Sequence, residues 1–149
     1  MKVEIDQSGK IEKTSRHTYL AFSNHEHFVV KISSTEKRKL QRYFRTIGKS
    51  RLFVYITFAA LITLILKKLK SKSCQIIIDV EYPGRNNQIK HFIKTFSPML
   101  LADDISFCRI GKKSRAHFLA YGTAIRKLRP DLVVNADQIL MIIKKSGST

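Results

Sequence analysis

Two acidic residues stand where the sequence predicts strands, and they are the side chains best placed to do chemistry. Asp6 lies in an alternating apolar and polar segment, residues 3–11, and Asp79 interrupts the isoleucine run of IIIDVEY. Aspartate is depleted from strands, so each of these residues needs a compensating interaction. If the two strands are neighbours, about 4.8 Å apart, carboxylates on the same side repel each other unless a cation lies between them.

The two acids therefore predict a site for a divalent metal ion. Mg²⁺ prefers hard oxygen ligands and keeps waters or substrate phosphates in the rest of its shell, and Mn²⁺ is the alternative. Such an ion polarises a phosphoryl oxygen and activates water. A single aspartate near a strand end is more often a turn-former. The matching positions of Asp6 and Asp79 favour metal binding for the pair.

The charge of the chain indicates the kind of partner. Lys and Arg number 28 against 11 Asp and Glu, giving a net charge of +17 and a pI near 10.2. This excess is typical of proteins that bind a polyanion, most often nucleic acid and otherwise an anionic membrane surface. The basic runs EKRKLQRYFR, KKLKSK, GKKSR and IRKLR are each expected to be solvated, and together they could bind a phosphate backbone. No small-molecule cofactor is expected.

The elements that must position the acids follow from periodicity. A chain of 149 residues predicts a single domain over residues 1–149. Strands are expected at residues 3–11, 16–24, 27–33, 74–82 and 104–111. Helices are expected at residues 33–47, 49–69, 86–96 and 114–128. Residues 130–145 are ambiguous between helix and strand, and helix is favoured. The order predicts an α/β fold with a mixed five-stranded sheet, a three-stranded antiparallel meander plus two parallel strands, flanked by helices.

The apolar segment Leu52–Leu66 raises a second possibility. It is shorter than the ~18–20 residues that a membrane span needs, so a buried core helix is favoured over a membrane anchor. Cys74 and Cys108 lack metal-ligand spacing and predict two half-buried thiols in a reducing compartment. The first twenty residues contain no apolar secretory segment, and we expect a cytoplasmic protein.

The order of elements, with acids on the first and fourth strands, resembles the ribonuclease H-like superfamily. IDQSG resembles its first-strand motif and IIIDVEY its fourth strand, which implies that Asp6 and Asp79 are catalytic metal ligands. Glu81 is an alternative at the fourth strand, because resolvase-like branches often use Glu there. IGKKSRAHFLA resembles the segment that enters the last helix of resolvase-like members, which implies a catalytic role for His117. The same resemblance implies nucleic-acid contacts for Lys112, Lys113 and Arg115.

The resemblance implies a metal-dependent nuclease or polynucleotidyl transferase acting on structured nucleic acid, either branched DNA or an RNA–DNA hybrid. It leaves the third metal ligand open among Glu81, His117, Glu36 and Asp137. Ala120 stands where a family aspartate is expected, which favours an alternative, a catalytically inactive nucleic-acid-binding module of the same fold. A small membrane-anchored basic protein is a further alternative. A homodimer is implied only by analogy, for a two-fold junction substrate.

Overall fold

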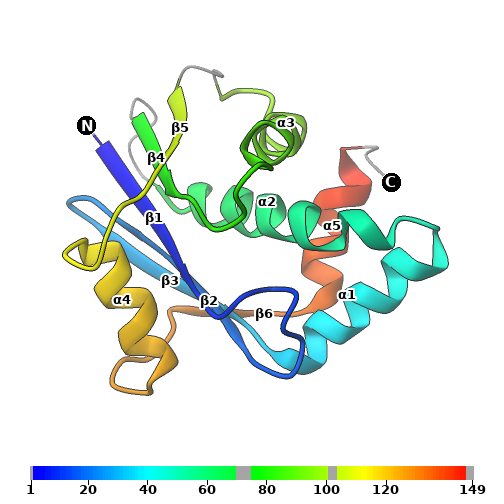
Figure 1. Cartoon of the computed structure of the whole chain (residues 1–149), viewed down its shortest axis with the longest axis horizontal. Helices are drawn as coiled ribbons and strands as arrows, with labels where there is room; N and C mark the ends of the chain where they lie inside the picture. Colours follow the sequence, from blue (N-terminus) through cyan, green and yellow to red (C-terminus); the bar gives the residue numbers. More distant parts are fainter. Residues whose placement is uncertain (1, 70–74, 101–103, 147–149) are drawn as a thin grey trace.

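The structure, a computed structural model, describes residues 2–69, 75–100 and 104–146, and it confirms the expected α/β class. One mixed sheet is formed by β1 (Lys2–Ser8), β2 (Thr18–Ser23), β3 (His27–Ile32), β4 (Gln75–Asp79), β5 (Ile105–Cys108) and β6 (Leu132–Val134). The helices are α1 (Ser34–Thr46), α2 (Phe53–Leu66), α3 (Asn86–Phe96), α4 (Arg115–Ala124) and α5 (Ala136–Lys145), with a 3-10 turn η1 (Ser50–Leu52) between α1 and α2 (Figure 1).

The strand order is β5-β4-β1-β2-β3-β6. The antiparallel meander is confirmed, because β1 pairs with β2 and β2 with β3 in opposite directions. The parallel part is also confirmed, since β4 runs parallel to both β1 and β5. The central strand β1 therefore joins the antiparallel and parallel halves of the sheet, and its end lies beside the end of β4.

The expected five strands are one too few. The segment predicted as a helix over residues 130–145 begins with β6, which runs parallel to β3 in register Val30–Leu132 and Ile32–Val134. Asp131 supports this edge pairing, because its carboxylate accepts a 2.7 Å bond from the Val29 N–H. A capping box of Asn135 and Gln138 then starts α5. Strand and helix are thus both present in this segment.

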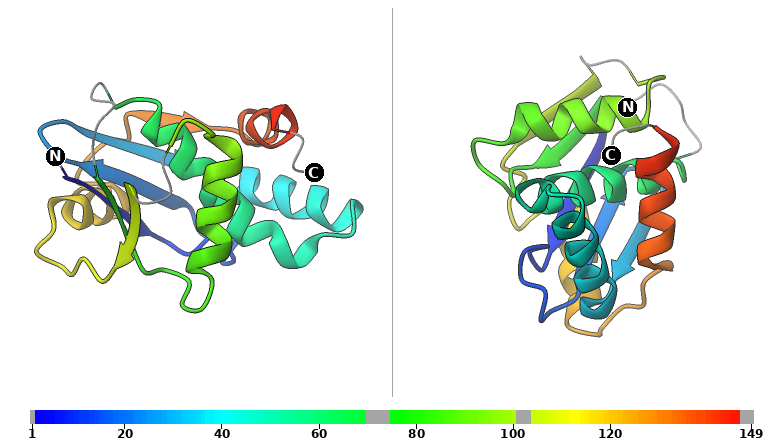
Figure 2. Two further views of the ribbon diagram at one scale, coloured as in Figure 1. Left: turned by 90° about the horizontal axis from the view of Figure 1, so that it is seen from above. Right: turned by 90° about the vertical axis from the view of Figure 1, so that its right-hand side faces the viewer.

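The helices divide between the two faces of the sheet. Helix α4 packs on β1 and β2 from one side, while α2 packs on β2 and β3 from the other and is itself covered by α3 and α5 (Figure 2). The apolar segment that raised the membrane alternative forms α2, in which ten of fourteen residues are buried. Among the described residues no helix is long and apolar enough to cross a membrane.

Alternation along β1 and β4 decides which face carries the acids. Val3 and Ile5 of β1, and Ile76 and Ile78 of β4, belong to the main core beneath α2. Side chains of a strand alternate between faces, so Asp6 lies on the opposite face, which α4 covers. The isoleucines thus provide the burial that fixes the register, and the register places the acids.

Helix α4 is fixed at both ends. Its N-cap residue, Ser114, accepts a 3.2 Å bond from the Ala116 N–H and donates a 3.2 Å bond to Glu4 of β1. Its other end stops at Ala124, short of the expected residue 128, because Arg126 adopts a left-handed backbone with φ of 65°. Glycine is the usual residue in such a helix-ending position.

The structure describes one of the two cysteines. Cys108, the last residue of the edge strand β5, is exposed, so its predicted half-buried state is wrong. An edge strand is covered by a neighbour on one side only, which leaves its terminal side chain open to water. Cys74 lies outside the described residues.

Candidate functional site

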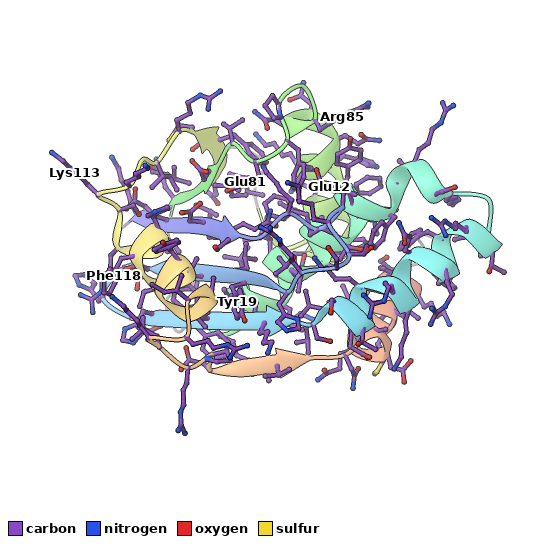
Figure 3. All side chains as sticks on the ribbon, turned by 60° about the horizontal axis from the view of Figure 1, so that its bottom comes forward. Glu12, Tyr19, Glu81, Arg85, Lys113 and Phe118 are labelled. Carbon is purple, nitrogen blue, oxygen red and sulfur yellow. The ribbon has the colours of Figure 1, made fainter. Side chains whose placement is uncertain are left out.

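Three carboxyl groups meet at the ends of β1 and β4. Ile5 pairs with Ile78 in the parallel ladder, so Asp6 and Asp79 follow at equivalent positions on neighbouring strands. One carboxylate oxygen from each of Asp6, Asp79 and Glu81 lies within 4.8 Å of the other two. Figure 3 labels Glu81. We call these three residues the acid cluster. Its oxygens are suited to hold one metal ion.

Hydrogen bonds fix two of the three carboxylates. Asp6 is 4% exposed, and one of its oxygens accepts a 2.9 Å bond from the Gln7 N–H. Its other oxygen lies 2.8 Å from Nδ1 of His117. Asp79 accepts a 2.8 Å bond from the Ile110 N–H, on the connection that leads from β5 to α4. Each acid is therefore oriented by a neighbouring segment before any ion binds.

Glu81 is paired with a cation that the sequence prediction missed. Nζ of Lys10 lies 2.9 Å from Oε2 of Glu81 and donates to the Glu81 carbonyl oxygen at 2.5 Å. The same ammonium sits 4.9 Å from the centre of the Tyr82 ring. The Tyr82 hydroxyl accepts bonds from the Gln7 side chain at 3.1 Å and the Ile11 N–H at 3.2 Å. The loop after β1 is thereby fastened to the residues that follow β4.

The electrostatics of the acid cluster disfavour three negative charges. Burial raises the pKa of Asp6, with a further increase from the charge of Asp79. Burial also raises the pKa of Glu81 to about 8, although the Lys10 ammonium opposes this increase. Burial and mutual repulsion therefore favour a protonated form of the cluster when no cation is bound. A divalent ion would displace that proton and neutralise the remaining charge.

His117 reaches the acid cluster from the first turn of α4. Its ring is nearly parallel to that of Tyr121, one helical turn further on, with an interplanar angle of 4° and centroids 6.0 Å apart. The stacking and the bond to Asp6 together define the ring orientation. The structure thus brings together four residues that the sequence singled out: Asp6, Asp79, Glu81 and His117.

Two other candidates for the third ligand lie elsewhere. Glu36 in the first turn of α1 accepts a 2.9 Å bond from the Ala136 N–H and pairs with Lys39 at 2.8 Å. Glu36 therefore stabilises the N-terminus of α5 and does not reach the acid cluster. Asp137 is exposed in the first turn of α5, where the helix dipole stabilises a negative charge. Neither residue belongs to the acid cluster.

Ala120 stands at the position where the resemblance expects an aspartate, and it packs in the interior. Ala120 is completely buried in a small apolar cluster with Tyr19, Ala21, Val29 and Leu119 between α4 and the sheet. An acid in its place would be surrounded by apolar atoms. The three predicted phosphate-binding cations lie at the N-terminal end of α4 and are all exposed: Lys112, Lys113 and Arg115.

The residues that sequence reasoning missed are Lys10 and Tyr82. Lys10 lies 71 residues from Glu81, so its role depends on the sheet topology and leaves no local signal. The turn before Lys10 does have a local signal in the sequence, a glycine. Gly9 has φ of 84°, and a Cβ there would lie 2.3 Å from the His17 carbonyl oxygen, so only glycine fits.

No protein-family model, curated protein or solved structure shows a significant match to this chain. A function for this protein is therefore inferred from the geometry of the site.

Proposed function

We propose that this protein is a divalent-metal-dependent nuclease that hydrolyses phosphodiester bonds in structured nucleic acid. The observation that carries the proposal is the acid cluster, in which Asp6, Asp79 and Glu81 bring oxygens within 4.8 Å of one another at adjacent strand ends. Three hard oxygen ligands in a partly open site suit Mg²⁺, with Mn²⁺ as the alternative. The net charge of +17 supports a polyanionic substrate.

A ribonuclease H-like architecture is part of the same proposal. Its support is the strand order β5-β4-β1-β2-β3, with an antiparallel meander and two parallel strands beside β1, and acids at the ends of β1 and β4. Strand β6 is an addition at the far edge.

Within the proposed site each side chain has a separate task. Asp6 and Asp79 are ligands on rigid strands, and Glu81 supplies a third carboxylate from the bend that follows β4. When bound, the ion would polarise the phosphodiester and activate water. His117 holds the Asp6 carboxylate in place and can exchange a proton with it at Oδ2. The exposed cations Lys112, Lys113 and Arg115 would hold the phosphate backbone.

The test is cleavage of labelled single strand, DNA duplex, RNA–DNA hybrid and four-way junction with Mg²⁺ or Mn²⁺. Wild type is compared with Asp6→Asn and with Asp137→Asn, which makes the same chemical change at an exposed site on α5. We expect metal-dependent cutting that Asp6→Asn abolishes and Asp137→Asn retains. Equal cutting by Asp6→Asn and wild type would contradict the proposal. Preference for the junction would call for a homodimer, measured by ultracentrifugation.

The alternative is a nucleic-acid-binding module without catalysis. The buried Ala120 favours it, because an apolar residue stands where the resemblance expects an acid. Under this alternative both aspartate variants bind nucleic acid as wild type does, or Asp6→Asn binds more tightly, and none of the three proteins cuts any substrate.

A further inference from the structure

A positively charged depression lies at the C-terminal end of α4, beyond the acid cluster. Two adjoining hollows of about 340 and 380 Å³ share His17, Tyr19 and Arg126 among their lining residues. Arg16 lines one hollow, and Lys31 and Arg129 line the other. We call the two together the cationic hollow. Among the described residues that line it there is no acidic side chain.

The positive charge of the cationic hollow is not neutralised by the fold. In the described part of the chain, none of its arginines forms an ion pair with an acid. Lys31 is directed over the Tyr19 ring, with its ammonium 5.9 Å from the ring centre. Burial, followed by the nearby charges of Lys31, Lys37 and Arg126, lowers the pKa of His17. A concave surface with unpaired cations attracts an anion.

Arg126 occupies a backbone position that favours glycine. Its N–H bonds to the Thr123 carbonyl at 3.1 Å, and the Lys127 N–H bonds to the Gly122 carbonyl at 2.9 Å, which is the hydrogen-bond pattern of a glycine-ended helix. Arginine at φ of 65° is less favourable than glycine in this position. Glycine would give a more stable helix end here, so the fold does not account for an arginine. We therefore look for a function of its guanidinium group.

The cationic hollow and the acid cluster lie on the same face of the sheet. Ser8, which lines the hollow, follows Asp6 by two residues and so projects to the same side, ~7 Å further along β1. Helix α4 connects the two sites: it rises ~11 Å from His117, beside Asp6, to its last residue Ala124, and Arg126 follows two residues later. A strand in a duplex rises ~3.4 Å per nucleotide, so the two sites are about two to four nucleotides apart.

We propose that the cationic hollow binds a backbone phosphate of the nucleic-acid strand, about two to four nucleotides from the bond held at the acid cluster, with Arg126 as its main ligand. The distance along the strand rests on the proposed nuclease function, whereas the phosphate contact itself requires no catalysis. Free phosphate has the same chemistry as a backbone phosphate, and the experiment separates the two.

The experiment measures binding of a fluorescently labelled DNA duplex by anisotropy, in EDTA and at several salt concentrations. The variant is Arg126→Gly, and Arg126→Asn is a second variant whose side chain tolerates a left-handed backbone. Arg51→Gln is the control, because it removes one exposed charge at the α1–α2 connection, at the opposite end of the molecule from α4 (Figures 1 and 2).

We expect both Arg126 variants to bind the duplex about ten-fold more weakly, as for one lost charged hydrogen bond. The slope of log affinity against log salt should fall by about 0.9, as for one phosphate contact. Arg126→Gly should unfold at the same temperature as wild type or higher, since its backbone strain is relieved. Arg51→Gln should match wild type in affinity and slope.

Duplex binding by both Arg126 variants equal to that of wild type would overturn the proposal. A site that binds only free phosphate would also overturn it. In that case inorganic phosphate would stabilise wild type against heat, Arg126→Gly would lose this stabilisation, and Arg126→Gly would bind the duplex as tightly as wild type. These readouts need no metal and no cleavage. A protein that fails the nuclease test can therefore still pass this one, and a nuclease that cuts normally can still fail it.

Discussion

Nδ1 of His117 lies 2.8 Å from Oδ2 of Asp6, which joins helix α4 to strand β1 across 111 residues of sequence. The pair is supported by a second contact between the same two elements, the 3.2 Å bond from Ser114 to Glu4. Glu4, Asp6 and Ser8 alternate onto one face of β1, so α4 is aligned along the row of polar side chains that begins at Glu4. Helix α4 thus contributes His117 beside the acid cluster, and its C-terminal end lies at the cationic hollow.

Replacing His117 with alanine should lower both stability and cleavage. The buried Asp6 carboxylate would lose one of its partners, which should cost about 1–2 kcal/mol of unfolding free energy. Urea denaturation measures this loss, and a cleavage assay measures the loss of rate. His117→Gln serves as the partial rescue, because its amide can still donate to Asp6. Unchanged stability in His117→Ala would mean that the bond contributes nothing to the fold.

Mg²⁺ or Mn²⁺ should raise the melting temperature of the wild-type protein. An ion at 100 times its Kd stabilises the folded state by ~2.7 kcal/mol, which is roughly 5–10 °C for a domain of this size. Asp79→Asn should lose the shift because a cluster ligand is missing, and Asp137→Asn should keep it. Equal shifts in all three proteins would mean that the ion binds somewhere other than the acid cluster.

Lys10→Met should tighten metal binding by about three- to ten-fold. The Lys10 ammonium lies 2.9 Å from a carboxylate oxygen of Glu81, a proposed metal ligand, so it competes with the ion and repels it. Lys10 is partly exposed, and solvent therefore limits the effect. The control is Lys13→Met, an exposed lysine of the same loop. Calorimetric titration with Mn²⁺ compares the variants, and weaker binding by Lys10→Met would show that Lys10 is needed to orient Glu81.

Local pattern was sufficient to predict several of the individual helices and strands. The i, i+3, i+4 spacing of apolar residues placed α3 at its observed bounds. The expected start of the first helix at residue 33 also agrees with the structure, in which Ser33 caps α1 by accepting a bond from the Glu36 N–H. In β4, Ile76 and Ile78 belong to the core and Asp79 lies on the opposite face, as the period-two alternation of a strand requires. These features depend on neighbours within a few residues, which the sequence shows directly.

Features that depend on the sheet as a whole were not predictable in the same way. Strand β6 has three residues and pairs with a strand about a hundred residues earlier, so its own pattern could not distinguish it from the helix that follows. The Lys10–Glu81 pair and the cationic hollow likewise join segments that are distant in sequence. Each requires knowledge of strand order, and periodicity alone does not supply it.

Lys37 provides a prediction that is independent of the acid cluster. Its side chain is completely buried under the loop after β1, and its ammonium donates to the carbonyl oxygens of Lys10 and Lys13 and to the Thr18 hydroxyl. Burial lowers its pKa to about 8, against 10.5 for an ordinary lysine. Between these two values the unfolded chain binds more protons than the folded one.

Raising the pH through this window should therefore make the Lys37 contribution to stability more favourable, by about 2 kcal/mol between pH 7.5 and 9.5. The measurement is the unfolding free energy in urea for wild type and Lys37→Met at each pH. Other titrating groups are common to both proteins, so the difference between the two curves isolates Lys37. We expect wild type to gain stability relative to Lys37→Met as the pH rises. A constant difference would mean that Lys37 keeps its ordinary pKa, with its three hydrogen bonds compensating for the loss of water.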